Sequence, residues 1–322
     1  MKVKIDRFVL SILITIVIAY FFPQWGIEGS VFPIDTISAI GIAFIFFFYG
    51  LKLSPTKLKA GLKNWKLHLL VQGATFLIFP LLVLLFRPFI QNQEQETIWL
   101  AFFFLAALPS TVSSSVVMVS MAKGNIPAAI FNASISGIIG IAVTPLWMGL
   151  FIDNAQTDFN FTSIYIKLIV QILLPVILGL LLQRYTNNFA PKHSSKLALF
   201  DKFIILLIIY KSFAESFDGN IFSTVSILDL GFLFGGVILL FLLMYFSTGF
   251  LSKILNFSKE DRIAAQFCGT KKSLVHGTVF SKILFGNMAT IGIILLPLML
   301  FHASQILIIS IIAGKLAKRE DL

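Results

Sequence analysis

Residues 108–115 read LPSTVSSS, and residues 268–273 read CGTKKS. Each stretch lies inside a long apolar segment, where a proline or a glycine loosens the hydrogen bonds of a helix. In a membrane, such freed backbone groups are tolerated only inside protein or along a water-filled cavity. The two stretches therefore predict two interrupted membrane helices. The alternative is a simple proline kink and a packing glycine.

The composition of the chain is that of a membrane protein. Of its 322 residues, 57% are hydrophobic and 12% are charged, and the mean hydropathy is +0.93. A soluble domain carries about 25% charged residues, so this chain has too few polar groups to coat a water-facing globule. Its single cysteine, Cys268, excludes a disulfide scaffold and a multi-cysteine metal site. The net charge of +10 does not indicate nucleic acid, because basic residues of membrane proteins gather in cytoplasmic loops.

The apolar segments predict ten membrane-spanning helices. A window of about 19 residues finds segments of about 20 residues, which is enough to cross a bilayer. In the first half they cover residues 8–22, 37–53, 67–86, 98–121 and 127–151. In the second half they cover residues 164–182, 197–213, 228–251, 263–285 and 290–313. The connectors between them are short, so no separate soluble domain is expected.

Lysine and arginine residues set the predicted orientation. With the N-terminus in the cytoplasm, the outer ends of the spans hold only Arg87, Lys167, Lys211 and Lys282, which is the positive-inside pattern. The same rule keeps the weakly apolar segment 263–285 as a span, since otherwise the basic C-terminal tail would lie outside. We therefore expect an integral protein of the cytoplasmic (inner) membrane, with both termini in the cytoplasm.

Five spans in each half of the chain indicate an inverted repeat. An odd number of spans makes the second half enter the membrane with the opposite orientation. We therefore expect an all-α membrane protein with repeats at residues 1–155 and 156–322. The fourth span of each repeat is the interrupted one, and paired interruptions of this kind are typical of the binding site of a transporter.

Hydroxyl groups cluster at the first interruption. Thr111, Ser113, Ser114 and Ser115 lie within about one turn of helix. Hydroxyl and carbonyl oxygens are ligands of hard cations. A membrane serine more often bonds a carbonyl of its own helix, which is the alternative for each residue alone. Because the cluster adjoins freed backbone, we expect it to line a substrate or ion site.

Three further polar residues lie in neighbouring spans. Asn132 and Ser136 are four residues apart, so they share one face of a helix beside a seam of small residues. Gln72 is a polar outlier in the third span. We expect all three to face the site, and a satisfied bond between helices is an equal alternative for Gln72.

Lys271 and Lys272 are the sharpest feature of the sequence. A lysine at the centre of a bilayer costs about 2.5–3.5 kcal/mol on insertion scales, so such residues are usually functional. Both lie in the middle of the segment 263–285, and Thr270 and Ser273 flank them. We expect these four residues to line the site. The alternative is a shifted span whose lysines extend to the membrane surface.

The sequence contains no motif of an enzyme. It has no Ser-His-Asp arrangement, phosphate loop or HExxH sequence, and its four histidines have no metal-ligand spacing. His302 and Gln305 lie in the last span, where either can simply bond a neighbouring helix, and no role is predicted for them. We expect no enzyme activity and no cofactor.

The two stretches resemble the broken helices of the bile acid:sodium symporter superfamily. The likeness runs through residues 108–115, 122–125 and 269–274, and it covers nearly the whole chain. The lysine pair and residues 297–302 (PLMLFH) further resemble the branch that contains member seven of solute carrier family ten and its bacterial relatives. The resemblance implies a panel domain, a core domain in which the broken helices cross, and alternating access. For better-known members it also implies sodium-coupled uptake of organic anions.

The sodium site is where this chain departs from the family pattern. Gln72, Ser114, Ser115 and Asn132 match positions that help to hold sodium in relatives. At the second break, better-known members carry a glutamate followed by glutamine and asparagine, whereas this chain has the lysine pair. An ammonium about 5 Å from Na⁺ costs about 3 kcal/mol at an effective dielectric near 20, and loss of the carboxylate forfeits a similar amount. The usual sodium site is therefore weakened.

The leading hypothesis is a secondary active transporter of a small organic anion. One lysine ammonium would occupy the place of the coupling cation, and the other, with nearby helix N-termini, would receive an anionic group of the substrate. The coupling ion is sodium or a proton, and the expected partners are membrane lipid and the substrate. Two alternatives stay open. One is ordinary sodium symport with the lysines pointing away, and the other is a regulatory or structural membrane protein that has lost transport.

Overall fold

Helices are the only regular structure in the described part of the chain. The computed structural model describes residues 7–27, 30, 32–53, 64–111, 113–152, 161–186, 189–220, 226–285 and 290–318. Within these residues, six helices are long and apolar enough to cross a membrane, namely Ile34–Lys52, Trp65–Phe89, Ile126–Gly149, Thr162–Gln183, Leu228–Ile254 and Ile291–Ala317. The all-helical prediction is confirmed, and the ten-helix inverted repeat stays a prediction.

The helices group into two compact units, and each unit takes segments from both halves of the chain. Unit 1 consists of Met1–Ser54, Phe151–Ser226 and Gly277–Leu295. Unit 2 consists of Pro55–Leu150, Ile227–His276 and Leu296–Leu322. Helices that are distant in sequence therefore pack together within each unit. The predicted repeats at 1–155 and 156–322 are defined along the sequence, and their boundaries differ from those of the two compact units. The repeats stay a prediction.

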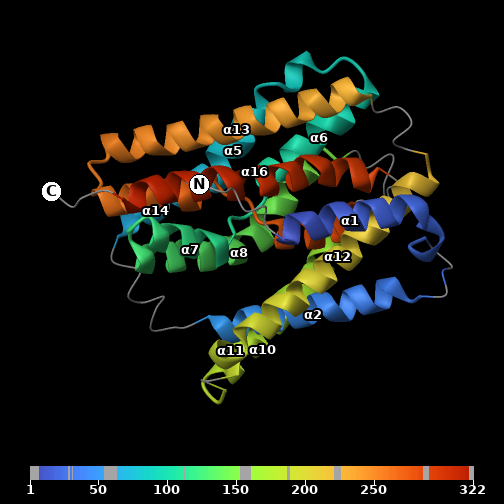
Figure 1. Cartoon of the computed structure of the whole chain (residues 1–322), viewed down its shortest axis with the longest axis horizontal. Coiled ribbons are helices and arrows are strands. Elements are labelled where there is room, and N and C mark those ends of the chain that lie inside the picture. Colours follow the sequence, from blue (N-terminus) through green and yellow to red (C-terminus); the bar gives the residue numbers. More distant parts are fainter. Residues whose placement is uncertain are drawn as a thin grey trace. The chain divides into compact units, whose positions relative to one another are not determined.

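Unit 1 contains the first helices of both halves. They are α1 (Arg7–Phe21), η1 (Pro23–Trp25), α2 (Ile34–Lys52), α9 (Phe161–Leu168), η4 (Ile169–Leu173), α10 (Leu174–Gln183), α11 (Phe189–Lys192) and α12 (Ser194–Asp218). Within this unit α1 packs on α12, and α2 packs on α10 (Figure 1). Gly50 and Gly179 face each other so closely that a Cβ on either would meet backbone atoms of the other helix. Small residues allow this close approach.

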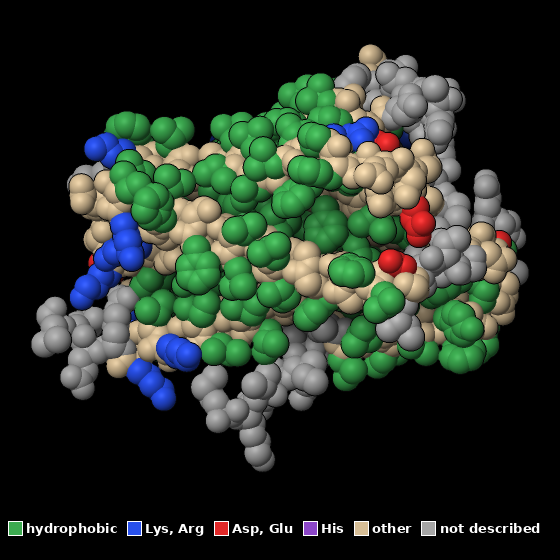
Figure 2. Space-filling view, turned by 90° about the horizontal axis from the view of Figure 1, so that it is seen from above, with side chains coloured by type: hydrophobic (Ala, Val, Ile, Leu, Met, Phe, Trp, Pro, Cys, Tyr) green, Lys and Arg blue, Asp and Glu red, His purple; other side chains and the backbone are tan. Residues whose placement is uncertain are grey.

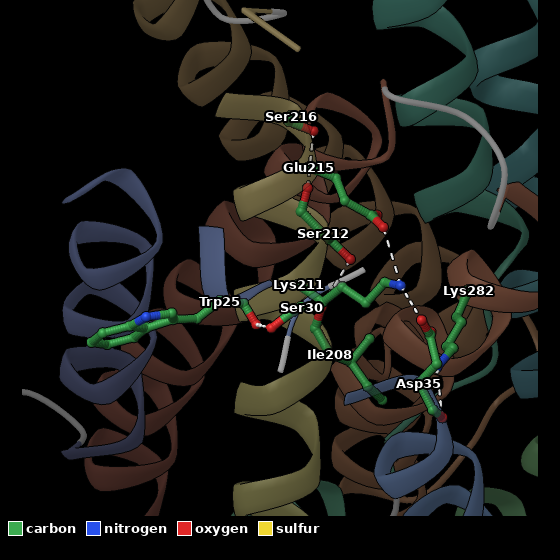
Figure 3. A network of polar contacts seen from close by, with 9 residues as sticks. All are labelled: Trp25, Ser30, Asp35, Ile208, Lys211, Ser212, Glu215, Ser216 and Lys282. Carbon is green, nitrogen blue, oxygen red and sulfur yellow. Dashed lines mark hydrogen bonds and ion pairs between the residues drawn. The ribbon is translucent and has the colours of Figure 1, made fainter. Parts of the chain in front are cut away.

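Charged side chains join three helix ends in unit 1 (Figure 3). Asp35, in the first turn of α2, pairs with Lys211 of α12 and also with Lys282 of α15 (Leu274–Phe285), the latter over 3.0 Å. Lys211 also pairs with Glu215, over 3.1 Å. The predicted orientation places all four residues toward the outer side of the membrane, and the observed pairs hold the three helix ends together.

Unit 2 contains both predicted interruptions. Its helices are α4 (Trp65–Gly73), η2 (Ala74–Ile78), α5 (Phe79–Leu84), η3 (Arg87–Phe89), α6 (Gln93–Ala107), α7 (Ser113–Met121), α8 (Ile126–Gly149), α13 (Ile227–Ile254), α14 (Lys259–Thr270) and, from Leu296 on, α16 (Ile291–Ala317). α14 packs against α13 and contacts α4, α7 and α8. Asn92, Asn125 and Ser258 start three of these helices, because each side chain accepts from a backbone N–H in the first turn.

The outer face of α13 is apolar. Phe232, Leu239, Phe246 and Phe250 each expose more than half of their surface. Figure 2 shows many hydrophobic side chains along the visible face, with charged side chains toward its ends. An exposed apolar face of this extent is typical of helices in contact with lipid.

The first interruption lies where the sequence predicts it. α6 ends at Ala107, and α7 begins at Ser113. Pro109 lacks an N–H and its ring disfavours a helical conformation in the residue before it, so Leu108 is extended, with ψ of 151°. The physical cause of this break is therefore local to the sequence.

The second interruption has a different cause. α14 ends at Thr270 and α15 begins at Leu274, with Lys271 extended at φ −84° and ψ 148°. Gly269 lies inside α14, where a Cβ would meet the side chain of Thr248. This glycine therefore serves helix packing and does not itself break the helix. Contacts of Lys272 with α6, η2 and α16 stabilise this break.

Candidate functional site

The two interruptions meet each other inside unit 2. The backbone N–H of Ser273 donates to the carbonyl oxygen of Pro109 over 2.9 Å. The hydroxyl of Ser110 donates to the carbonyl oxygen of Cys268 over 2.6 Å. Each break thus satisfies polar groups that the other leaves without helical partners, as buried backbone requires. We call residues 108–115 and 268–273 the crossing site.

Backbone carbonyl oxygens enclose the ammonium group of Lys272. It donates to Thr75 over 2.8 Å, to Ala106 over 2.5 Å and to Leu108 over 2.8 Å, which uses its three N–H bonds. The last two carbonyls belong to the C-terminal end of α6, where the helix dipole is negative. The ring of Phe79 lies 4.1 Å away and adds a cation–π contact. Lys272, which is 0% exposed, therefore has the surroundings that a bound cation would have.

A proline explains why the Thr75 carbonyl is available. Pro80 has no N–H, so it cannot donate to the Phe76 carbonyl in α-helical register or to the Thr75 carbonyl in π-helical register. The Phe79 N–H donates to the Ala74 carbonyl five residues before it, which is the π-helical register, so the Thr75 carbonyl has no helical donor. The chain forms the π-helical turn η2 there, and the Phe76 carbonyl accepts from the indole of Trp147 over 2.8 Å. The Thr75 carbonyl accepts from Lys272. The π-helical turn η2 thus provides one of the three carbonyl oxygens that surround the Lys272 ammonium.

The ammonium group of Lys271 reaches the other half of the first interrupted helix. It donates to the hydroxyl of Ser114 over 3.2 Å, and the hydroxyls of Ser114 and Thr111 lie 3.4 Å apart. Ser114 is in the first turn of α7, where backbone N–H groups have no acceptor within the helix and the helix dipole is positive. Lys271 is 0% exposed, whereas Thr111 and Ser114 are partly exposed. The Lys271 ammonium and the positive N-terminus of α7 therefore lie close together beside partly exposed hydroxyls. This arrangement favours the binding of an anion.

The residues that flank the lysines have different contacts. The Thr270 hydroxyl bonds the Gln266 carbonyl of its own helix, which is the common arrangement for a membrane hydroxyl. The Ser273 hydroxyl accepts from the backbone N–H of His276 and lies 2.9 Å from Nδ1 of that residue, so it caps α15. Both lysines are 0% exposed, and the partners of their ammonium groups all belong to unit 2.

Gln72 and Asn132 lie together in unit 2. The amide nitrogen of Gln72 donates to the backbone and side-chain oxygens of Asn132, each over 3.1 Å. Asn132 in turn donates to the carbonyl of Ala128 and contacts Nδ1 of His68. The bond between helices that was the alternative for Gln72 is therefore present. The side-chain oxygen of Gln72 is nevertheless buried without a partner among the described residues.

The remaining predicted residues belong to the first break and its support. The Ser136 hydroxyl accepts from the backbone N–H of Ser110 over 2.9 Å, so α8 supports the break. The Ser115 hydroxyl is buried and has no partner in the described part of the chain. The side chain of Ser113 lies outside the described residues. Ser115, like Gln72, therefore has a buried side-chain oxygen atom without a partner among the described residues.

The described residues contain no conventional metal site. Among them, no group of three or more His, Cys, Asp or Glu side chains could hold a metal ion. The crossing site itself has no acidic residue in its sequence. A cation bound here would depend on neutral oxygen atoms, which bind a hard cation more weakly than carboxylates do.

A model of the SBF-like CPA transporter family matches residues 6–318. The chain belongs to this family. Protein PA2026 of Pseudomonas aeruginosa is 36% identical to this SBF-like CPA transporter, over 98% of the chain and 94% of PA2026. YfeH of Escherichia coli is 32% identical over 98% of the chain and 94% of YfeH. Sodium/bile acid cotransporter 7 of Danio rerio is 31% identical over 97% of the chain and 93% of that protein.

Membership of the SBF-like CPA transporter family confirms the resemblance that the two breaks indicate. The family description and the cotransporter names describe transport rather than enzyme chemistry. The family membership and the apolar helices together show that the chain is an integral membrane protein of a transporter family.

Gln305 is a contact residue of this SBF-like CPA transporter that was not predicted. Its amide pairs with both backbone groups of Lys272, over 2.9 and 2.8 Å. An isolated glutamine in an apolar span suggests only a bond to some neighbouring helix, so its partner could not be identified. Thr75 and Ala106 act through backbone carbonyls, which no residue type marks. Pro80 is the signal that could have indicated free carbonyls in its span.

Proposed function

We propose that this SBF-like CPA transporter moves a small organic anion by alternating access, with the Lys272 ammonium in place of a bound coupling cation. The observation that carries the proposal is the set of three carbonyl oxygens around that ammonium. Oxygen atoms of this kind are the ligands of hard cations in proteins, and here a covalently attached cation occupies them.

An attached ammonium changes which ions can bind nearby. Na⁺ cannot share the three carbonyl oxygens with Lys272. A second cation about 5 Å away would be repelled by about 3 kcal/mol at an effective dielectric near 20, which is a loss of about two powers of ten in affinity. Coupling through a proton that Lys271 or Lys272 gains and loses during the cycle requires no sodium.

The N-terminus of α7 is the proposed position of the anion. The Lys271 ammonium and the N-terminal N–H groups of α7 both favour negative charge there. The partly exposed hydroxyls of Thr111 and Ser114 supply further donors. The proposed substrate is therefore an organic anion with a carboxylate or sulfonate group. Bile acids, for which relatives are named, are one such class.

The proposed cycle uses two domains. We assign unit 1 to the panel domain and unit 2, which holds both breaks, to the core domain that the family resemblance implies. Ten spans in two inverted repeats, in the inner membrane and with both termini in the cytoplasm, complete the proposed arrangement. The distribution of Lys and Arg supports this orientation.

Ordinary sodium-coupled symport is a second candidate. The buried oxygen atoms of Gln72 and Ser115, which have no partner among the described residues, favour it. The family resemblance implies that both residues match positions that help to hold sodium. Among the relatives, the Danio rerio protein is named as a sodium/bile acid cotransporter. The two candidates differ measurably, because only sodium symport requires a sodium gradient.

Uptake into proteoliposomes tests the proposal. Uptake of radiolabelled taurocholate, a bile acid, is measured with sodium replaced by choline and with an imposed pH gradient. We expect saturable uptake that survives sodium replacement and responds to the pH gradient. In Lys272→Met the uptake should fall about tenfold or more, the equivalent of about 1.4 kcal/mol. Lys253→Met, at an exposed position on α13, is the matched control and should leave uptake unchanged.

Two results would contradict the proposal. Uptake that requires a sodium gradient, ignores pH and survives Lys272→Met would favour the second candidate. An absence of saturable uptake for taurocholate and for other organic anions would indicate a regulatory or structural protein on the same fold.

A further inference from the structure

Lys272 has backbone groups that cannot be satisfied within a helix. α14 ends before it and α15 begins after it, so its N–H and carbonyl face other elements. The side chain of Gln305, on α16, satisfies both: Oε1 accepts from the Lys272 N–H over 2.9 Å, and Nε2 donates to the Lys272 carbonyl over 2.8 Å. Among side chains, an amide carries a donor and an acceptor side by side in this way. Gln305, which is 0% exposed, thus replaces the missing helical bonds.

His302 selects the orientation of the Gln305 amide. Its Nδ1 lies 3.2 Å from Nε2 of Gln305. Because Nε2 has two N–H bonds and one points to the Lys272 carbonyl, the other donates to Nδ1, and the histidine ring carries its proton on its own Nε2. A flipped amide would set its N–H groups against the Lys272 N–H. His302 and the Lys272 backbone therefore define the same single orientation.

The same part of α16 also supports the Lys272 side chain. The ring of Phe301 packs against the ring of Phe79, with centroids 5.9 Å apart. Phe79 is the ring that faces the Lys272 ammonium. Residues 301–305 of α16 therefore act on Lys272 from two directions, through its backbone and through the ring beside its charge.

We propose that Gln305 is a positioning residue of the transport site. It fixes the backbone of Lys272 so that the ammonium reaches the carbonyl oxygens at the end of α6. The inference rests on the proposed role of Lys272 in transport. The pairing itself can be tested without transport, so the two proposals can fail separately.

Hydrogen–deuterium exchange of a peptide that contains Lys272 tests the pairing. In Gln305→Leu the Lys272 N–H loses its acceptor, and we expect its exchange to become about tenfold faster or more. Gln266→Leu is the matched control, because Gln266 is a partly buried amide of α14 that bonds the Tyr245 carbonyl instead. Unchanged exchange in Gln305→Leu, or an equal increase in Gln266→Leu, would overturn the inference.

Two histidine variants separate positioning from general stability. The side-chain oxygen of asparagine can replace Nδ1 as an acceptor, so His302→Asn keeps this contact and His302→Leu removes it. We expect exchange at Lys272 to stay within about twofold of the native rate in His302→Asn and to rise toward that of Gln305→Leu in His302→Leu. Equal exchange in the two histidine variants would show that His302 does not orient the amide.

The kinetics of uptake give the functional readout. Gln305→Leu should lower the maximum rate of taurocholate uptake about tenfold and change KM by less than about twofold, because it disturbs Lys272 and leaves the proposed anion position at Lys271 intact. A rise in KM without a fall in rate would overturn the positioning role. If the native protein does not transport taurocholate, the proposed function fails for this substrate while the exchange result still decides the pairing.

Discussion

Lys271 and Lys272 are adjacent in the chain, yet their ammonium groups reach opposite ends of the first interruption. Lys272 bonds carbonyl oxygens at the C-terminal end of α6, and Lys271 bonds Ser114 in the first turn of α7. A positive charge is stabilised at a helix C-terminus and destabilised at an N-terminus. The two lysines are therefore electrostatically unequal. Lys272 completes the end of one helix, whereas Lys271 has an environment that a bound anion would improve.

Replacing Lys272 by alanine should destabilise the protein. The substitution leaves three buried carbonyl oxygens without their donor, and each unsatisfied buried group costs about 1–3 kcal/mol. We expect the unfolding temperature in detergent to fall well below that of the native protein. Lys253→Ala, at an exposed position, is the control and should leave the unfolding temperature unchanged.

A small amine should reverse part of this loss. In Lys272→Ala, methylammonium can enter the vacated space, donate to the three carbonyls and face the Phe79 ring. We expect it to raise the unfolding temperature and to restore part of the uptake. Tetramethylammonium has the same charge and no N–H, so it should restore neither. Equal effects of the two ions would contradict a cation position defined by hydrogen bonds.

Replacing Lys271 by methionine should have the opposite effect on stability. A like charge at a helix terminus costs about 0.3–1 kcal/mol, so removing the ammonium beside α7 should leave the unfolding temperature constant or raise it. The KM for a transported anion should rise about tenfold, since a charged contact with the anion is lost. Lys271→Arg keeps the charge and should keep most of the affinity. A destabilisation as large as that of Lys272→Ala would show that the two lysines are equivalent.

The first break could be predicted because its signal lies in the local sequence. Pro109 lacks an N–H in the middle of an apolar segment, which interrupts a helix wherever that helix packs. The lysine pair is conspicuous because burying lysine is costly and therefore rare. The assignment of the second break to Gly269 was less exact, since that glycine is helical and the extended segment begins after Thr270.

The surroundings of Lys272 could not be predicted, because they consist of groups that the sequence does not mark. Thr75 and Ala106 contribute carbonyl oxygens, which every residue has. Gln305 lies 33 residues away in the chain, and its own span does not indicate which helix it will bond. Helical periodicity gives no help, since these spans are apolar on nearly all sides. Tertiary packing alone decides which lysine faces which helix end.

The close contact between α2 and α10 should not tolerate a side chain larger than that of glycine at Gly179. A Cβ on Gly179 would meet backbone atoms of α2, whereas a Cβ on Gly231 of α13 would meet nothing within 4 Å. Overpacking costs about 1–3 kcal/mol, and a Gly→Ala change at an open helical position gains about 0.4–1 kcal/mol. We expect Gly179→Ala to lower the unfolding temperature and Gly231→Ala to leave it constant or raise it. Similar results for both variants would argue against a close helix contact at Gly179.

Cys268 should report whether the crossing site opens to water. It is the only cysteine of the chain, it is 0% exposed, and its carbonyl accepts from Ser110 of the opposite break. A thiol must reach water to react with N-ethylmaleimide. We expect slow labelling in the resting protein, because the cysteine is buried. Addition of a transported anion should change the rate, because alternating access must open this region on one side of the membrane.

The reference for this measurement is Cys268→Ala combined with Lys253→Cys, which has a single exposed thiol on α13. Its labelling rate should be high and should not respond to the anion, so it separates a change at the crossing site from a change in the reagent or the detergent. Ser110→Ala removes one bond across the two breaks and should speed labelling of Cys268 without any anion. The Cys268 thiol could stay unreactive in the resting protein, in the presence of the anion and in Ser110→Ala. That result would mean that the two breaks form a closed packing contact. Alternating access through the crossing site would then be contradicted.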